Sequence, residues 1–289
     1  MRLVAFEQSG SSRLGVVEND SVIDLATAAP DLSRDLTGLI LRGNSGWTSV
    51  ADAAQRAPAS ARRPLGSLKL LPPIQNPGKI VCLGLNYVDH AAEGGHAKPD
   101  YPSVFLRVST SLVAHNAPIL RPRCSDKLDY EAELAVIIGK TAKHVKKADA
   151  LGYVAGYSCF NDGTLRDYQR KTSQWTIGKN FDATGGFGPW FVTADEAPAG
   201  AVGLAIRSKL NGQVMQNANT RDMIFPVDET IALLTECLTL EPGDVIAMGT
   251  PSGVGYARKP PVWMKPGDVI EIEIEGIGTL RNPIADETG

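Results

Sequence analysis

The sequence lacks several features that would identify common kinds of site. Its four cysteines include no Cys-x-x-Cys pair, so the sequence predicts neither a structural zinc site nor a disulfide scaffold. No segment approaches the length of a continuous apolar run that could span a membrane, and an acidic residue, Glu7, follows soon after the start. We therefore expect a cytoplasmic protein in a reducing environment, with no signal peptide and no membrane anchor.

The chain also lacks a large excess of charge of either sign. The chain has 29 Lys and Arg residues against 32 Asp and Glu residues, a formal net charge of -3, and no basic run. Nucleic acid is therefore not an expected partner. The glycine-containing segment 249–255 leads to Pro260 and Pro261 instead of a helix, and it lacks the Gly-x-Ser-x-Gly spacing. Neither a phosphate-binding loop nor a nucleophile elbow is predicted there.

What is present is typical of a globular protein, with 43% hydrophobic and 21% charged residues over 289 positions. A proline- and glycine-rich stretch at 71–78 divides the chain into two predicted domains. Residues 1–72 combine short strand patterns with two amphipathic stretches and form a small α+β domain. Residues 73–289 contain many strand patterns, one clear helix at 226–239 and no βαβ alternation. The predicted fold class is therefore β-rich α+β.

One predicted strand, residues 128–139, carries acidic side chains at alternate positions. Asp129, Glu131 and Glu133 fall on one face, whereas Tyr130 and Leu134 fall on the other. Three carboxylates on one face of an apolar strand repel one another and resist burial, which favours a cation above them. Taken alone, the pattern is also compatible with a solvated strand face.

A further carboxylate, Asp162, ends the next predicted strand. With Glu131 and Glu133 it would form a set of three oxygen ligands without His or Cys, which favours a hard cation such as Mg²⁺ or Mn²⁺. The alternative for Asp162 is an Asx turn with Gly163.

A histidine and a glutamate, His90 and Glu93, stand three residues apart in an Ala-rich turn. At this spacing the two side chains share a helical face, and a carboxylate bound to one imidazole nitrogen orients the other as a general base. An ordinary surface ion pair is the alternative. The following segment, 94–102, contains two glycines and two prolines and is a candidate lid.

A cationic set follows Asp162. Lys179 lies between Gly178 and Asn180, where it could neutralise a substrate carboxylate or a developing enolate, although most lysines in such a context are surface residues. Arg166 and Gln169 precede it on a short polar stretch.

Taken in order, these motifs resemble the fumarylacetoacetate hydrolase family, and in particular bacterial acylpyruvase or diketo-acid hydrolase-like members with an N-terminal cap domain. The resemblance covers about residues 75 to 285. The matching segments are Gly84-Leu85-Asn86-Tyr87 with His90 and Glu93, Asp129 to Leu134, Asn161-Asp162, Arg166-Asp167 with Gln169, Gly178 to Asp182, and Gly249 to Gly255.

The resemblance implies mixed β-sheets in a barrel-like main domain, a homodimer, and Mg²⁺ or Mn²⁺ held by Glu131, Glu133 and Asp162. It also implies a water-activating pair, His90 and Glu93, with Lys179 as an electrostatic partner. The expected substrate-binding residues are Arg107, Arg166, Gln169 and Thr250. Arg107 stands where the family commonly has a Lys-Pro pair, so a planar, bidentate donor replaces an ammonium group.

The implied substrates are small 2-oxo and 2,4-dioxo acids. We expect hydrolysis of a C–C bond in an acylpyruvate or diketo-deoxy sugar acid, giving pyruvate or another 2-oxo acid and a carboxylate. Decarboxylation of an oxaloacetate-like acid, or isomerisation of a 2-hydroxy-diene-dioate, is the alternative on the same site. From another class, a keto-acid-binding protein without turnover is the remaining alternative.

Overall fold

The protein, seen in a computed structural model, is described over residues 1–32, 34–93 and 97–288. Its elements form the predicted β-rich α+β fold. None of the helices in these ranges is long and apolar enough to cross a membrane. Gly94 and Gly95, which belong to the candidate lid, lie outside the described residues.

The largest element is a mixed sheet of twelve strands that runs through both predicted domains. Its main path has the order β4-β3-β2-β1-β14-β12-β11-β17-β6-β7, with β5 paired to β1 and β8 to β14. The strands are β1 (Arg2–Gln8), β2 (Ser11–Glu18), β3 (Ser21–Asp24), β4 (Arg62–Pro64), β5 (Lys69–Leu71), β6 (Ile80–Gly84), β7 (Ser103–Arg107), β8 (Leu112–Val113), β11 (Ala132–Ile138), β12 (Val154–Asp162), β14 (Gly185–Thr193) and β17 (Val245–Ala247).

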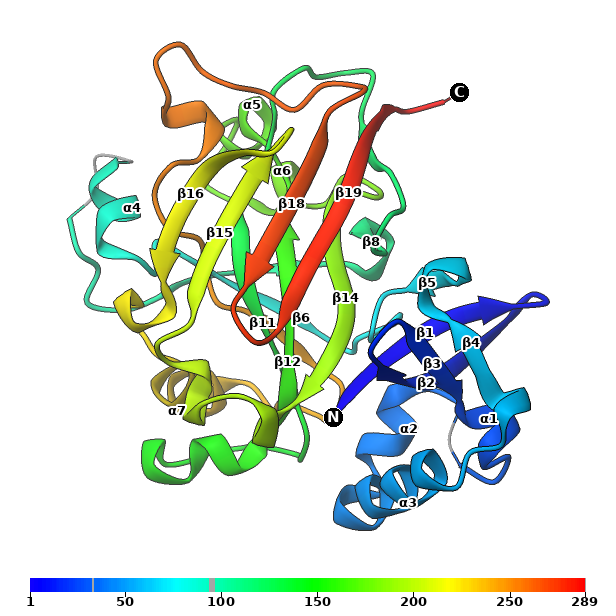
Figure 1. The fold of residues 1–289 in the computed structure, drawn as a ribbon. Helices are drawn as coiled ribbons and strands as arrows, with labels where there is room; N and C mark the ends of the chain where they lie inside the picture. Colours follow the sequence, from blue (N-terminus) through cyan, green and yellow to red (C-terminus); the bar gives the residue numbers. More distant parts are fainter. Residues whose placement is uncertain (33, 94–96, 289) are drawn as a thin grey trace.

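A second sheet of five strands lies over the first, in front of β11, β12 and β14 in Figure 1. Its order is β16-β15-β18-β19-β9, and both sheets are open in the described residues instead of closing into a barrel. The strands are β9 (Ile119–Arg121), β15 (Ala205–Leu210), β16 (Gln213–Asn219), β18 (Val269–Ile274) and β19 (Gly278–Asp286). A short pair, β10 (Leu128–Asp129) and β13 (Thr164–Leu165), completes the β-structure.

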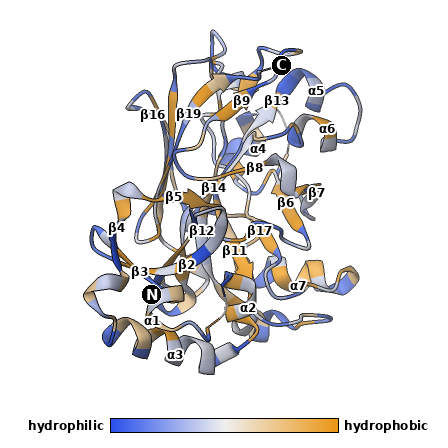
Figure 2. Cartoon of the chain, turned by 90° about the vertical axis from the view of Figure 1, so that its right-hand side faces the viewer, coloured by the Kyte–Doolittle hydropathy of each residue, from blue (hydrophilic) through white to orange (hydrophobic). Residues whose placement is uncertain are grey.

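The central strand β11 separates two hydrophobic cores because its side chains alternate between the faces of the sheet. Leu134, Val136 and Ile138 pack in the core between the two sheets. Ala135 and Ile137 point the other way, into the core shared with the N-terminal residues. All seven side chains of β11 are buried, and Figure 2 shows hydrophobic colour on β11, β17 and β6.

The helices are short and lie at the periphery. Helix α7 begins after Pro226 and buries Val227, Ile231 and Leu234, a spacing that presents one apolar face. In Figure 1 the N-terminal unit, with its own helices α1 to α3, stands to one side and joins the main sheet where β1 pairs with β14. The helices are α1 (Leu25–Ala28), α2 (Leu36–Ile40), α3 (Gly43–Gln55), α4 (Val88–Glu93), α5 (Arg166–Gln169), α6 (Thr176–Lys179) and α7 (Val227–Cys237).

Candidate active site

Three buried carboxylates come together where β11 begins and β12 ends. Glu131 lies in the gap between β10 and β11, Glu133 is the second residue of β11, and Asp162 is the last residue of β12. The antiparallel pairing of β11 with β12 brings these ends side by side, and the Asp162 N–H donates to the Glu131 carbonyl at 3.0 Å. Potential ligand atoms of the three carboxylates all lie within 4.8 Å of one another.

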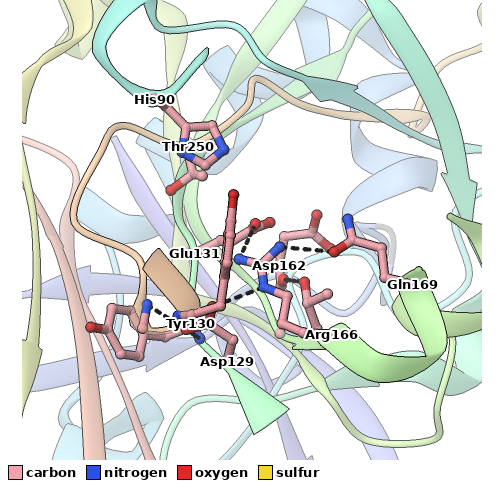
Figure 3. Close-up of polar contacts among 12 residues, drawn as sticks. His90, Asp129, Tyr130, Glu131, Asp162, Arg166, Gln169 and Thr250 are labelled. Carbon is pink, nitrogen blue, oxygen red and sulfur yellow. Dashed lines mark hydrogen bonds and ion pairs between the residues drawn. The ribbon is translucent and has the colours of Figure 1, made fainter. Parts of the chain in front are cut away.

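Two cations bind the Glu131 carboxylate directly. The Lys179 ammonium lies 2.5 Å from Glu131 Oε2 and 2.6 Å from Asp162 Oδ2, so it bridges two of the three acids. Arg166 donates from Nη2 to Glu131 Oε1 at 2.7 Å, as Figure 3 shows. The structure therefore brings the predicted cations Lys179 and Arg166 to the predicted acidic residues.

Another cation, Arg107, contacts Asp162 but does not line the cavity. Arg107 donates from Nη1 to Asp162 Oδ1 at 2.5 Å and to the Gly163 carbonyl, from Nη2 to Thr184, and from Nε to Ser111. Four donor contacts with the protein leave little of the guanidinium for a ligand. Its side chain is fully buried, and this geometry favours support of Asp162 over direct contact with a substrate.

The pKa values of Glu131 and Glu133 are shifted in opposite directions. Burial raises the pKa of Glu131, but Lys179 and Arg166 outweigh it and hold that pKa below its ordinary value. For Glu133, burial and the neighbouring carboxylates Asp162 and Glu131 raise the pKa well above its ordinary value. Within the described ranges no Lys or Arg pairs with Glu133, and its Oε2 accepts only the Gly249 N–H, at 3.0 Å.

This arrangement fits a hard divalent cation. A second positive group facing Glu133 would remove the repulsion that opposes its ionisation. Carboxylate oxygens are the ligands that Mg²⁺ and Mn²⁺ prefer, and an oxygen that accepts one hydrogen bond keeps a second lone pair for a metal. Glu131, Glu133 and Asp162 are thus the residues that would hold the ion.

His90 lies on α4, across the cavity from the acids, and enters from the top of Figure 3. Its Nδ1 is 3.5 Å from Glu93 Oε2 and has no hydrogen-bond partner among the described residues. Both Glu93 oxygens instead accept the Gly253 N–H, at 3.0 and 3.1 Å. The predicted pair is therefore adjacent but not hydrogen-bonded, and Glu93 connects α4 to the 249–255 loop.

These side chains surround a cavity of about 220 Å³. The three acids, His90, Lys179, Arg166, Gln169 and Thr250 all line it, whereas Arg107 and Glu93 do not. Thr250 donates to the Ala132 carbonyl at 3.0 Å, next to the acids. Gln169 accepts from Arg166 Nη1 at 3.0 Å, so it also fixes the position of that arginine.

Two glycines allow the close packing that shapes this cavity. Gly178 precedes Lys179 and lies so near Gln169 that an added Cβ would be 2.4 Å from its backbone nitrogen. Gly84 lies under the ring of Trp175, where a Cβ would be 2.2 Å from the indole. No larger residue fits at either position without moving α6 or Trp175.

Asp129, which begins the acidic pattern, is separate from the other acids. It accepts from Arg166 Nε at 2.8 Å and from the backbone N–H groups of Gly255 and Tyr256 at 2.7 and 3.0 Å. It thus fixes the position of an arginine and of a loop, and it does not join the three clustered acids.

Sequence reasoning missed several residues of this site. Arg170 and Tyr256 line the cavity. Gln216 does not line it, but its side chain accepts the Ala132 N–H and donates to the Thr250 hydroxyl. Arg170 was recognisable in principle, because it stands four residues after Arg166 and shares its helical face. Tyr256 and Gln216 reach the site only through long-range folding.

Residues 79–285 match the protein family described as "Fumarylacetoacetate (FAA) hydrolase C-terminal". A fumarylacetoacetate hydrolase domain-containing protein 2 homolog from Dictyostelium discoideum is 41% identical over 95% of this chain and 93% of its own length. The mitochondrial oxaloacetate tautomerase fahd2 from Xenopus laevis is 40% identical over 98% of this chain and 90% of its own length. These similarities include the N-terminal unit as well as the main sheet.

Solved structures show the same similarity. A fumarylacetoacetate hydrolase from Exiguobacterium antarcticum superposes with a TM-score of 0.86 and 35% identity, over 99% of this chain and all of the other. A maleylpyruvate hydrolase from Sphingobium sp. SYK-6 gives 0.81 and 31% over 99% and 100%. A 2-hydroxyhepta-2,4-diene-1,7-dioate isomerase from Mycobacterium marinum gives 0.78 and 31% over both whole chains.

Proposed function

The chain belongs to the fumarylacetoacetate hydrolase family, and we propose that it is a divalent-cation-dependent enzyme acting on 2-oxo acids through their enolates. One observation carries this proposal: the buried acids Glu131, Glu133 and Asp162 open into a cavity that His90 and Lys179 also line. A cation bound there would polarise the 2-oxo group and stabilise negative charge on its oxygen. Mg²⁺ and Mn²⁺ are the candidates.

The reaction that the side chains support is hydrolysis of a C–C bond in a 2,4-dioxo acid. His90 takes a proton from water, and the oxygen attacks the C4 carbonyl. The C3–C4 bond then breaks, its electron pair forms the enolate of the 2-oxo acid, and C3 takes the proton back from His90. The products are a carboxylate and a 2-oxo acid such as pyruvate. Lys179, paired with Glu131 and Asp162, lowers the cost of negative charge in the cavity.

A second candidate reaction is keto–enol tautomerisation of oxaloacetate. The similarity to the Xenopus laevis oxaloacetate tautomerase extends over nearly the whole chain, which favours it. Here His90 would move a proton between C3 and the enol oxygen, and no water would attack. His90 and Glu93 are adjacent but not hydrogen-bonded to each other. This geometry is compatible with tautomerisation by His90 alone, and equally with hydrolysis by the two residues together.

One experiment separates these reactions. The purified protein is incubated with Mg²⁺ or Mn²⁺ and acylpyruvates, diketo sugar acids, enol-oxaloacetate and 2-hydroxy-diene-dioates, and the products are identified by NMR. Pyruvate plus a carboxylate indicates hydrolysis, a faster enol-to-keto conversion indicates tautomerisation, and carbon dioxide indicates decarboxylation. If every substrate stays unchanged while 2-oxo acids still bind to the Mn²⁺-loaded protein, it is a keto-acid-binding protein and the enzymatic proposal fails.

We also propose a homodimer. The last strand of the large sheet, β7, presents exposed Val104 and Leu106, and Val108 follows on the same face. Three apolar side chains at alternate positions form a stripe that a second copy would cover. Light scattering should give a mass of two chains for the protein and of one chain for Leu106→Lys, and a monomeric wild-type protein would exclude this assembly.

A further inference from the structure

Arg170 is a cation of the cavity that has no carboxylate partner in the part of the chain that the structure describes. It follows the last residue of α5, lines the cavity and is exposed, and no carboxylate in the described ranges pairs with it. Arg107, Arg166 and Lys179 are different, because each is buried and bonded to at least one acid. The guanidinium of Arg170 is therefore available to a ligand.

Contacts with Tyr256 hold this guanidinium near the acids. The central carbon of Arg170 lies 4.5 Å from the centre of the Tyr256 ring, and that of Arg166 lies 4.4 Å from the same centre. The backbone N–H of Tyr256 donates to buried Asp129 at 3.0 Å, which fixes the backbone that carries the ring. The Arg170 N–H also reaches the Arg166 carbonyl, at 3.3 Å. Arg170 is thus placed about one helical turn, roughly 5.4 Å, beyond the arginine that binds Glu131.

The charges around the cavity indicate what this group would bind. The buried acids are Asp129, Glu131, Glu133 and Asp162, and the buried cations are Arg107, Arg166 and Lys179. With a divalent cation these groups carry one excess positive charge, which the carboxylate of a 2-oxo acid would balance. Arg170 adds a further positive charge, and a second anionic group on the ligand would balance that one.

The cavity wall suits a carbon chain between two such groups. Leu83, Phe105 and Trp175 supply apolar surface in the same cavity. Trp175 packs edge-on against Phe105, with ring centres 5.7 Å apart, so this wall is fixed. An arginine is also the cation best shaped for a terminal carboxylate, because its planar fork donates two parallel hydrogen bonds.

We propose that Arg170 binds a second carboxylate at the far end of the substrate and so selects 2-oxo dicarboxylic acids over 2-oxo monocarboxylic acids of the same length. This inference rests on the proposed function, because it assumes that the other end of the acid lies at Glu131, Glu133 and Asp162. It adds the substrate class: the molecule carries two anionic ends joined by a short chain.

The test is a binding measurement with a matched pair of acids. 2-Oxoglutarate and 2-oxopentanoate have the same five-carbon chain, and only the first has a second carboxylate. Calorimetry on the Mn²⁺-loaded protein should show 2-oxoglutarate binding about 10- to 100-fold more tightly. Arg170→Gln should remove that preference while leaving the affinity for 2-oxopentanoate unchanged, and Arg170→Lys should restore part of it.

A second exposed arginine serves as the control. Arg56 follows α3 in the N-terminal unit, and Arg56→Gln should leave both affinities as in the wild type. A preference that survives in Arg170→Gln would overturn the inference and leave the proposed function intact. If neither acid binds the loaded wild-type protein, the proposed function fails and the inference fails with it.

Discussion

Arg107 and Asp162 form an ion pair in which both side chains are fully buried and Nη1 lies 2.5 Å from Oδ1. The pair joins β7 to the end of β12, and Asp162 lines the cavity whereas Arg107 does not. Arg107 therefore contributes through the position and charge of Asp162.

Replacing Arg107 by Leu should destabilise the fold by about 3 to 5 kcal/mol, because it leaves a buried carboxylate without this partner. Urea unfolding of the metal-free protein measures the loss. Arg107→Lys keeps the charge and should lose less. A higher KM with unchanged stability would instead indicate that Arg107 binds substrate.

Replacing Glu133 by Gln should weaken Mn²⁺ binding by at least about 10-fold, since it removes a carboxylate ligand. The metal-free variant should be no less stable than the wild type, because the substitution also removes repulsion with Asp162 and Glu131. Calorimetric titration with Mn²⁺ and thermal unfolding check the two expectations. Unaltered Mn²⁺ affinity would refute the ligand assignment.

Replacing His90 by Ala should lower turnover about 10²- to 10⁴-fold, the usual contribution of a general acid–base group. Mn²⁺ affinity should remain near that of the wild type, because the proposed ligands are three carboxylates and His90 is not among them. Steady-state kinetics and metal titration on the same preparation test both parts. Full activity in this variant would exclude His90 as the proton carrier.

Acid should destabilise the protein partly through His115. Burial and the nearby charge of Arg281 lower the pKa of His115 to about 4, and its Nδ1 accepts the Arg281 N–H at 3.1 Å. In the unfolded chain the pKa is about 6.5, so the unfolded state binds the proton more readily and stability falls as pH drops from about 6.5 to about 4.

The expected loss from this one group is about 1 to 3 kcal/mol over that pH range. His115→Gln keeps an acceptor but does not titrate, so its unfolding free energy should fall less steeply across the same range. Urea unfolding at several pH values gives the two curves. Parallel curves for wild type and variant would show that His115 keeps its ordinary pKa.

Local patterns were enough to predict much of the main sheet and the acids of the site. Alternation along 128–139 predicted that Leu134 lies on the strand face opposite Glu131 and Glu133. In the structure Leu134 packs in the core between the two sheets, although the predicted strand is interrupted at residues 130–131, between β10 and β11. Strands β16 and β19 were not predicted from the sequence. In β16, polar residues such as Gln213 and Gln216 obscure the apolar pattern, and the packing partner of the strand is distant in the chain.

The sequence by itself determined the residue types of the site, their order and the faces of the strands, because side-chain direction in a strand is a local property with period two. Only the tertiary structure decided which charges meet. Strand pairing and packing place Arg107 against Asp162, Lys179 between two acids, and Arg170 beside Tyr256 at the cavity. These contacts join residues distant in the chain, so no local spacing encodes them, and they determine whether a given cation supports an acid or remains available to a substrate.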